Sequence, residues 1–140
     1  MKKTKLLLSL AMLFPTLANA ADINPLTWER KNAMIIAASA DLNITANVGE
    51  HDLAFGRAED CFDFDDVDMK LEINGRLVNM IKSCPSARVA VYAPKTKAGK
   101  EYLLNIFKSE KPFEILGSQF TATKFNERYK ELLEMTSNAL

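Results

Sequence analysis

The side chains best suited to chemistry are six carboxylates within ten residues: Glu59, Asp60, Asp63, Asp65, Asp66 and Asp68. Hard oxygen ligands of this kind suit Ca²⁺, and two carboxylates at a suitable separation can hydrolyse a glycosidic bond. The spacing does not fit an EF-hand, because counting from Asp63 puts Asp68 where the calcium loop requires glycine. Calcium binding, catalysis and a solvated partner surface all stay open, and the pattern favours the last.

Within this run, two aromatic residues alternate with two acids. The order Phe62, Asp63, Phe64, Asp65 predicts a strand edge with the phenylalanines pointing inward and the acids facing water. We therefore expect a partner to meet the acids of the second part of the run: Asp63, Asp65, Asp66 and Asp68.

A second charged segment carries the opposite sign. Lys95, Lys97 and Lys100 surround Gly99 in what the sequence indicates is a turn after Pro94. It is not a phosphate loop, because the first glycine and the Ser or Thr after the lysine are missing. The three lysines are predicted to bind an acidic partner or an anionic envelope polymer, and a solubilising turn explains them about as well.

Other catalytic or metal sites are poorly supported by the sequence. His51 is the only histidine, and it stands in the polar segment Gly49–Asp52. A Ser-His-Asp or Cys-His arrangement would have to use it, and a zinc site would need further histidine or thiol ligands. We therefore expect no catalytic residue, no metal site and no cofactor.

The two cysteines are Cys61 and Cys84. An even number of cysteines in an exported protein favours a structural disulfide, whereas a redox pair favours the close C-x-x-C spacing. A disulfide between them would close a loop of about 24 residues, which stabilises a fold by about 3 kcal/mol. We predict a Cys61–Cys84 disulfide.

The chain begins like an exported precursor. Lys2, Lys3 and Lys5 precede an apolar stretch, and residues 18–20 (Ala-Asn-Ala) match a signal peptidase site. We predict a cleavable signal peptide at residues 1–20, with cleavage between Ala20 and Ala21. The stretch is too short to span a membrane, which needs about 20 apolar residues, so we expect no stable insertion after cleavage. The predicted location is the bacterial periplasm, with full secretion as the second choice.

The processed chain would be mildly acidic. It keeps 15 basic and 18 acidic residues once the three lysines of the signal are removed. Nucleic-acid binding requires clustered Lys and Arg, so it is not expected. About 120 residues form one domain of ordinary size, and no linker or repeat divides residues 21–140.

The elements that would position these side chains form two halves. The alanine-rich segment 28–40 predicts an N-terminal helix, and Leu42–Gly49 hints at a short strand. Residues 67–73 alternate with the period of a half-buried strand, and Asn74-Gly75 predicts a type I′ hairpin that sets Leu71 opposite Val78 and Met69 opposite Met80.

The rest of the second half is predicted to extend this sheet. Residues 88–92 and 102–107 are expected as strands, with one or two short strands over 113–116 and 120–122. Phe125, Tyr129, Leu132 and Leu133 form one apolar stripe of a C-terminal helix over 123–135. The predicted fold is α+β: an antiparallel sheet of about four to five strands with an N-terminal helix and a C-terminal amphipathic helix.

Together these features favour a small protein-binding module whose partner is another envelope or periplasmic protein. Its expected role is an accessory or assembly factor of a pilus or secretion apparatus, or an inhibitor or immunity protein. The alternative is a small envelope hydrolase that acts on glycan or peptidoglycan through carboxylates of the acidic segment.

Overall fold

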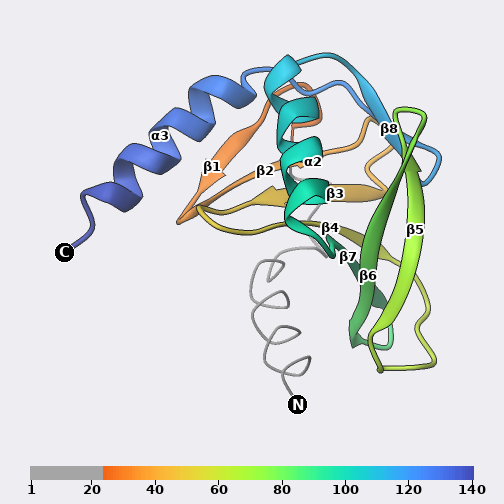
Figure 1. The fold of residues 1–140 in the computed structure, drawn as a ribbon. Helices are drawn as coiled ribbons and strands as arrows, with labels where there is room; N and C mark the ends of the chain where they lie inside the picture. The colour runs from red at the N-terminus through yellow and green to blue at the C-terminus, as the bar shows by residue number, and fades with distance from the viewer. Residues whose placement is uncertain (1–23) are drawn as a thin grey trace.

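The computed structural model describes residues 24–140, and its main feature is a seven-stranded antiparallel sheet (Figure 1). The strands are β1 (Glu29–Lys31), β2 (Met34–Ala38), β3 (Ile44–Val48), β4 (Leu53–Ala58), β5 (Val67–Ile73), β6 (Arg76–Ser86) and β7 (Val89–Pro94). Their order across the sheet is β1-β2-β3-β4-β7-β6-β5. The hairpin of β5 and β6 stands steeply to β1–β4 in Figure 1, as the right-handed twist of strands leads one to expect.

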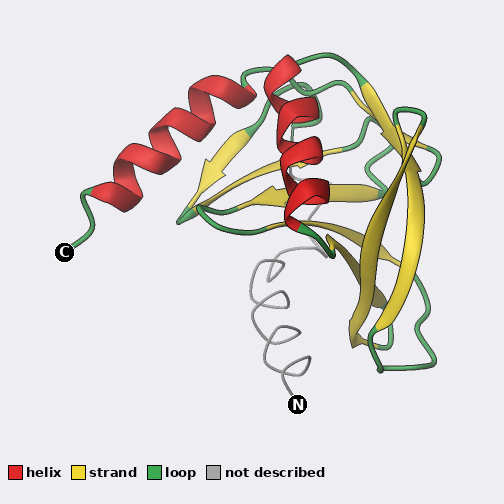
Figure 2. Ribbon diagram, viewed as in Figure 1, coloured by secondary structure: helices red, strands yellow, loops and turns green. Residues whose placement is uncertain are grey.

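One face of this sheet is covered by two helices and a small hairpin (Figure 2). Helix α2 (Lys97–Ser109) packs against β6 and β7, and helix α3 (Phe125–Ser137) packs against β1 and β2. Strands β8 (Phe113–Ile115) and β9 (Ser118–Phe120) form a separate two-stranded sheet, and β8 contacts β5. We call the covered face the inner face and the opposite one the outer face.

Aromatic side chains fill the space between the inner face and its cover. The Trp28 ring lies 5.2 Å from that of Phe107 and 4.9 Å from that of Phe125, between centroids. Phe113 and Phe120 stack with centroids 4.8 Å apart across the β8–β9 hairpin. Such offset and edge-to-face pairs stabilise a core beyond the area that they bury. The sheet is thus a rigid platform for the loops at its edges.

The β5–β6 hairpin and the C-terminal helix agree best with the sequence expectations. Strands β5 and β6 pair Leu71 with Val78 and Met69 with Met80, and Asn74 and Gly75 take the positive φ angles of 51° and 77° that a type I′ turn requires. The C-terminal amphipathic helix is α3, which buries Phe125 and Leu132. Strands β3, β7, β8 and β9 also lie close to the segments expected for them.

The predicted fold class is wrong. The protein is mostly β, with seven strands in one sheet and two in another, rather than an α+β domain with four to five strands. Among residues 24–140 the first helix follows the large sheet, so the expected N-terminal helix over 28–40 is absent there. That segment forms β1 and β2, because Ile35 is buried on the inner face and Ile36 on the outer one. A strand buried on both faces loses the alternation by which strands are recognised.

The prediction of a strand over 102–107 is also wrong. It lies within α2, which begins at the N-cap Thr96, whose hydroxyl accepts a hydrogen bond from the backbone N–H of Gly99 at 3.0 Å. Leu103, Ile106 and Phe107 are the buried side chains of this helix, and their spacing is helical.

The expected signal peptide and its cleavage site between Ala20 and Ala21 lie outside the described residues. Within residues 24–140, no helix is long and apolar enough to cross a membrane.

Candidate functional site

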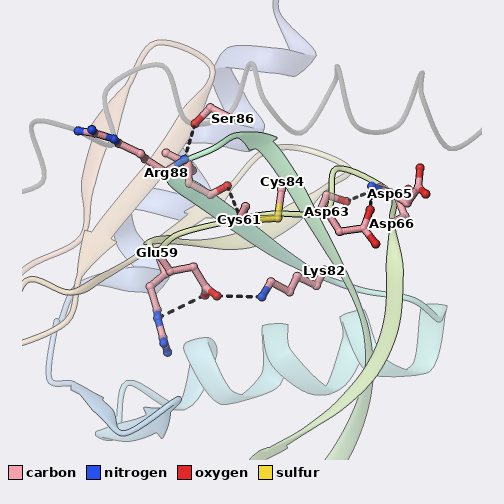
Figure 3. The surroundings of a disulfide bond; sticks show 12 residues. Glu59, Cys61, Asp63, Asp65, Asp66, Lys82, Cys84, Ser86 and Arg88 are labelled. Atoms are coloured by element: carbon pink, nitrogen blue, oxygen red, sulfur yellow. Dashed lines mark hydrogen bonds and ion pairs between the residues drawn. A yellow bond between two sulfur atoms is a disulfide. The ribbon is translucent and has the colours of Figure 1, made fainter.

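Five of the six acids of the run lie in a loop, residues 59–66, between β4 and β5, which we call the acidic–aromatic loop, and the sixth, Asp68, lies in β5. Its first part is tied covalently to β6, because Cys61 and Cys84 form a disulfide with Cα atoms 6.1 Å apart (Figure 3). The backbone N–H groups of Glu59 and Cys61 also donate to the carbonyl oxygens of Arg88 and Ala87, at 3.1 and 2.8 Å. The predicted disulfide is confirmed, and it anchors the loop to the sheet.

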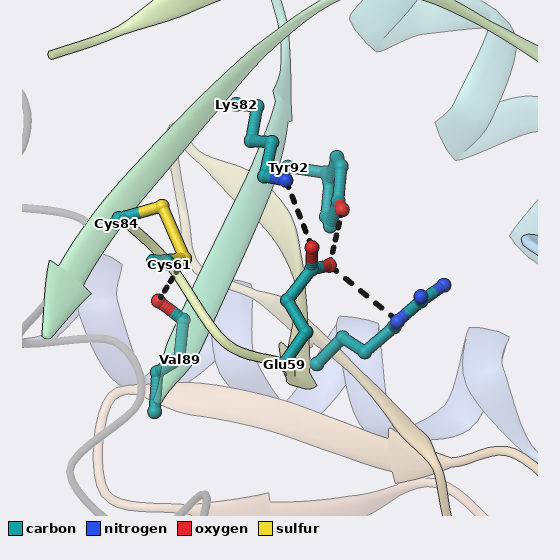
Figure 4. A network of polar contacts seen from close by, with 7 residues as sticks. Glu59, Cys61, Lys82, Cys84, Val89 and Tyr92 are labelled. Carbon is teal, nitrogen blue, oxygen red and sulfur yellow. Dashed lines mark hydrogen bonds and ion pairs between the residues drawn. A yellow bond between two sulfur atoms is a disulfide. The ribbon is translucent and has the colours of Figure 1, made fainter. Parts of the chain in front are cut away.

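Glu59 anchors the same end of the loop through its side chain (Figure 4). Its carboxylate accepts hydrogen bonds from Lys82 Nζ at 2.8 Å and from the Tyr92 hydroxyl, and it lies 3.4 Å from Arg57 Nε. Burial alone would raise the pKa of Glu59, but the hydrogen bonds from Lys82 and Tyr92 and the charges of Lys82 and Arg57 outweigh it and lower that pKa. Burial and the bond to Glu59 raise the pKa of Tyr92. Glu59 is therefore held ionised, which suits an anchor and not a general acid.

Two further hydrogen bonds hold the other end of the loop. The Ser83 hydroxyl donates to Asp66 Oδ1 at 2.9 Å, where the loop enters β5. The backbone N–H of Asp65 donates to Asp63 Oδ1 at 2.9 Å, which closes a local turn of the Asx type. Figure 3 shows Asp63, Asp65 and Asp66 together beside the disulfide. The loop is therefore fixed at both ends and shaped from within.

The tip of the loop points into solvent. The side chain of Phe62 is 94 % exposed and that of Phe64 is 53 % exposed. The expectation that both phenylalanines point inward is wrong, because residues 59–66 pair with no neighbouring strand and so do not alternate between two faces. A fixed loop that exposes two aromatic rings between carboxylates is the most distinctive surface feature among the described residues.

The lysines form part of a neighbouring region. Lys95 follows β7, and Lys97 and Lys100 lie in the first turn of α2, so the expected turn is largely a helix start. Lys95 Nζ lies 2.5 Å from Asp68 Oδ2 of β5, and β6 is the strand between β5 and β7. Both members of this pair are exposed, so it contributes little to stability.

The chemistry open to the remaining residues is limited. His51 is exposed, with its Nε2 3.6 Å from the carboxylate of the neighbouring Glu50. Among residues 24–140, no three His, Cys, Asp or Glu side chains are grouped so that they could hold a metal ion. The contacts of Asp63, Asp66 and Asp68 are of the kind that shape a loop: an Asx turn, a serine hydroxyl and an ion pair. This arrangement suits recognition of another molecule.

The sequence did not reveal the residues that anchor the loop. Tyr92 and Lys82 are 33 and 23 positions from Glu59, and they meet it only because β7 and β6 are adjacent in the sheet. The exposed rings could have been suspected, because Asp63 and Asp65 flank Phe64 and Asp63 directly follows Phe62.

No model of a known protein family matches the chain, and comparisons with curated proteins and with solved structures give no match either.

Proposed function

We propose that this protein is a non-enzymatic binding module of the bacterial envelope and that the acidic–aromatic loop is its contact surface for another protein. The observation that carries the proposal is the contrast within the loop: its base is fixed by a disulfide and by the half-buried carboxylate of Glu59, whereas Phe62 is 94 % exposed. Aromatic residues, phenylalanine among them, are enriched in protein interfaces relative to the rest of the protein surface.

Fixing the loop before binding favours affinity. A flexible segment loses conformational entropy when it is ordered against a partner, and a pre-ordered one loses less. The disulfide, the Glu59 contacts and the Ser83–Asp66 bond all hold the backbone that carries Phe62 and Phe64. We therefore expect the loop to bind in nearly the conformation that it has here.

The chemistry of the loop favours a partner with a basic rim around an apolar pocket. Asp60, Asp63 and Asp65 are exposed beside the two rings. Complementary charges would steer the partner and select it, while a ring buried in a pocket would supply most of the affinity. Lys95, Lys97 and Lys100 remain proposed as secondary contacts for acidic residues of the same partner.

Charge reversal tests this proposal. The tagged protein is isolated from periplasmic extract after mild cross-linking, and its partners are identified by mass spectrometry. We expect one partner in stoichiometric amount, lost in an Asp63→Lys/Asp65→Lys variant and kept in a Glu72→Lys variant, which changes an exposed acid of β5 outside the loop. The identity of the partner would distinguish an assembly factor of a pilus or secretion apparatus from an inhibitor or immunity protein. Equal recovery with both variants would contradict a role of the loop.

A glycan or peptidoglycan hydrolase is the second candidate, because the acidic run could supply two carboxylates. It predicts that one Asp→Asn change abolishes turnover while the fold persists. A binding surface predicts graded losses spread over several residues. The structural contacts of Asp63, Asp66 and Asp68 favour the binding module.

A further inference from the structure

A pocket of about 440 Å³ lies where the connection between β2 and β3 meets the end of β4 and the turn between β8 and β9. Its volume is in the range of pockets that hold small organic ligands. Leu42, Asn43 and Ala58 are exposed, so a ligand can reach the pocket from solvent. Six residues line it: Leu42, Asn43, Arg57, Ala58, Leu116 and Ser118.

Both leucines of this pocket take backbone angles that leucine rarely adopts. The φ angle is 63° at Leu42 and 51° at Leu116, in the left-handed region where asparagine is enriched several-fold. Leu116-Gly117 joins β8 to β9 with φ angles of 51° and 78°, and Asn74-Gly75 joins β5 to β6 with φ angles of 51° and 77°. The hairpin of β5 and β6 has the asparagine that such a turn favours, and the hairpin of β8 and β9 has leucine in its place.

The core explains one of these leucines better than the other. Leu116 packs against the core of the inner face, so its side chain also serves the fold. Leu42 is 36 % exposed and lines the pocket. Backbone strain persists only where the surrounding structure enforces it, and it clusters at ligand sites. The position of Leu42 therefore points to a bound molecule with an apolar group.

Asp41 fixes the shape of the pocket before a ligand arrives. Its carboxylate accepts hydrogen bonds from Ser39 Oγ at 2.7 Å, from Ser118 Oγ at 2.8 Å and from the backbone N–H of Asn43 at 3.0 Å. The bond to Ser118 ties the β2–β3 connection to β9, 77 positions further along the chain. These three donors offset the negative charge of Asp41, and they leave it as part of the wall of the pocket.

Arg57 gives the pocket an excess of positive charge. Its Nε lies 3.4 Å from Glu59 Oε1, and Lys82 Nζ lies 2.8 Å from Glu59 Oε2, so two cations share one carboxylate. Within residues 24–140, the Arg57 side chain meets a carboxylate through Nε alone, which leaves Nη1 and Nη2 for a further acceptor. The side chain is 35 % exposed. The planar fork of a guanidinium group matches the two oxygens of a carboxylate.

We propose that this pocket binds an apolar carboxylic acid. Arg57 pairs with the carboxylate through its terminal nitrogens, and Leu42 and Leu116 contact the apolar group. Two sources supply this chemistry: the C-terminus of a peptide that ends in an apolar residue, and a free apolar acid. The site contains neither Phe62 nor Phe64, so this proposal and the proposed function of the acidic–aromatic loop can fail independently.

An NMR titration tests the proposal on the protein purified from the periplasmic fraction with ¹³C-labelled leucine methyl groups. The probes are the tripeptide acetyl-Ala-Ala-Leu with a free C-terminal carboxylate, the same tripeptide with a C-terminal amide, and hexanoate. We expect both acids to shift the methyl signals of Leu42 and Leu116. The amide should bind about tenfold more weakly than the free tripeptide, because it lacks the charge that pairs with Arg57.

Two variants separate the charge from the apolar wall. Arg57→Gln should weaken the binding of both acids by about tenfold or more and leave the binding of the amide nearly unchanged. Leu42→Asn should weaken the binding of the acids by about fivefold, because it removes apolar contact. Its urea midpoint should stay equal to that of the wild type or rise, because asparagine is favoured at a positive φ.

Leu77→Asn is the matched control, because Leu77 is an exposed leucine in strand β6 outside the pocket. It should change the affinity for the acids by less than about twofold. Circular dichroism checks that each variant is folded. If Arg57→Gln does not fold, the comparison of the free tripeptide with its amide decides whether the charge is recognised.

Three results would overturn the proposal: no shift of either methyl signal with either acid, equal affinity for the acid and amide tripeptides, or undiminished binding by Leu42→Asn. A Leu42→Asn variant with a lower urea midpoint would assign this leucine to the fold and would also contradict it. Tighter binding of the tripeptide assigns the pocket to the end of a chain, and equal or tighter binding of hexanoate assigns it to a free acid. Both of these outcomes support the proposal.

Discussion

Aromatic side chains occur in two regions of this protein under opposite conditions. In the core, Trp28, Phe107 and Phe125 are 0–2 % exposed and contact one another. In the acidic–aromatic loop, Phe62 and Phe64 stand in solvent between carboxylates. Aromatic rings therefore stabilise the core in one region and are exposed to solvent in the other.

The two regions are also held in place by different means. The core rings are positioned by their packing against each other and against the sheet. The loop has no such packing at its tip, and a disulfide and the ionised Glu59 hold its base. The comparison indicates that core substitutions should act on stability, that anchor substitutions should act on both stability and binding, and that tip substitutions should act on binding.

The largest loss of stability is expected in the core. Phe107→Ala removes a ring that packs against Trp28, Phe55, Phe113 and Phe125, so it should lower the free energy of unfolding by about 3–5 kcal/mol. Urea denaturation followed by tryptophan fluorescence measures this loss. Phe64→Ala is the same chemical change in the loop and serves as the control. Equal losses for the two variants would remove the distinction between the regions.

The second largest loss of stability is expected when the disulfide is removed. A Cys61→Ala/Cys84→Ala variant loses the covalent tie between the loop and β6, and its free energy of unfolding should fall by about 2–4 kcal/mol. Partner binding should weaken as well, because the loop then has to be ordered on contact. Reduction of the wild type by dithiothreitol should reproduce both effects. A reduced protein that unfolds at the same urea concentration and binds as well as before would contradict the role given to this bond.

Glu59 is expected to contribute about 1–2 kcal/mol to the free energy of unfolding, and only at pH values at which its carboxylate is ionised. Because the fold lowers the pKa of Glu59 below its ordinary value of 4.5, its stabilisation is present above pH 4.5 and is lost as the pH falls through the lowered pKa. Glu59→Gln should therefore be less stable than the wild type at pH 7, and the difference should shrink below pH 4.5. Urea denaturation at a series of pH values gives both curves. A difference that is independent of pH would show that the charge is not what anchors the loop.

The smallest effect on stability should come from the tip. Phe62→Ala removes an exposed ring, so the free energy of unfolding should change by less than about 0.5 kcal/mol. Partner affinity should nevertheless fall by about tenfold or more. Leu77→Ala is the matched control, because Leu77 is 66 % exposed on the β5–β6 hairpin, away from the loop. A similar loss of affinity in both variants would contradict a specific role of the loop, because it would show that any exposed apolar side chain contributes to partner affinity.

The parts of the fold that the sequence predicted are those with a local signal. Residues 67–73 alternate strictly and are followed by Asn74-Gly75, and α3 has a clear apolar stripe, so the sequence predicts both elements. The segment 34–38 was missed because it is buried on both faces and rich in alanine, which resembles a helix. The start of α2 carried a usable signal, because Thr96 is a good N-cap and Leu103, Ile106 and Phe107 are spaced as on a helix.

Only those parts of the candidate site that have a local sequence signal could be predicted. The cysteine pair and the acidic run are visible in the sequence, and the structure brings them together. The contacts of Glu59 with Tyr92 and Lys82 depend on the order of strands β4, β7 and β6, which no local pattern reveals. Alternating residue types do not predict the outward direction of Phe62 and Phe64, because side chains alternate between two faces only within a strand and these residues lie in a loop.

The most direct test of the account compares the wild type with a Phe62→Ala/Phe64→Ala variant in one experiment. The affinity for the cross-linked partner is measured by surface plasmon resonance, and the urea midpoint of each protein is measured alongside it. We predict that the double variant loses partner binding while its midpoint stays close to that of the wild type. Undiminished binding by a folded double variant would contradict the claim that this loop is the contact surface.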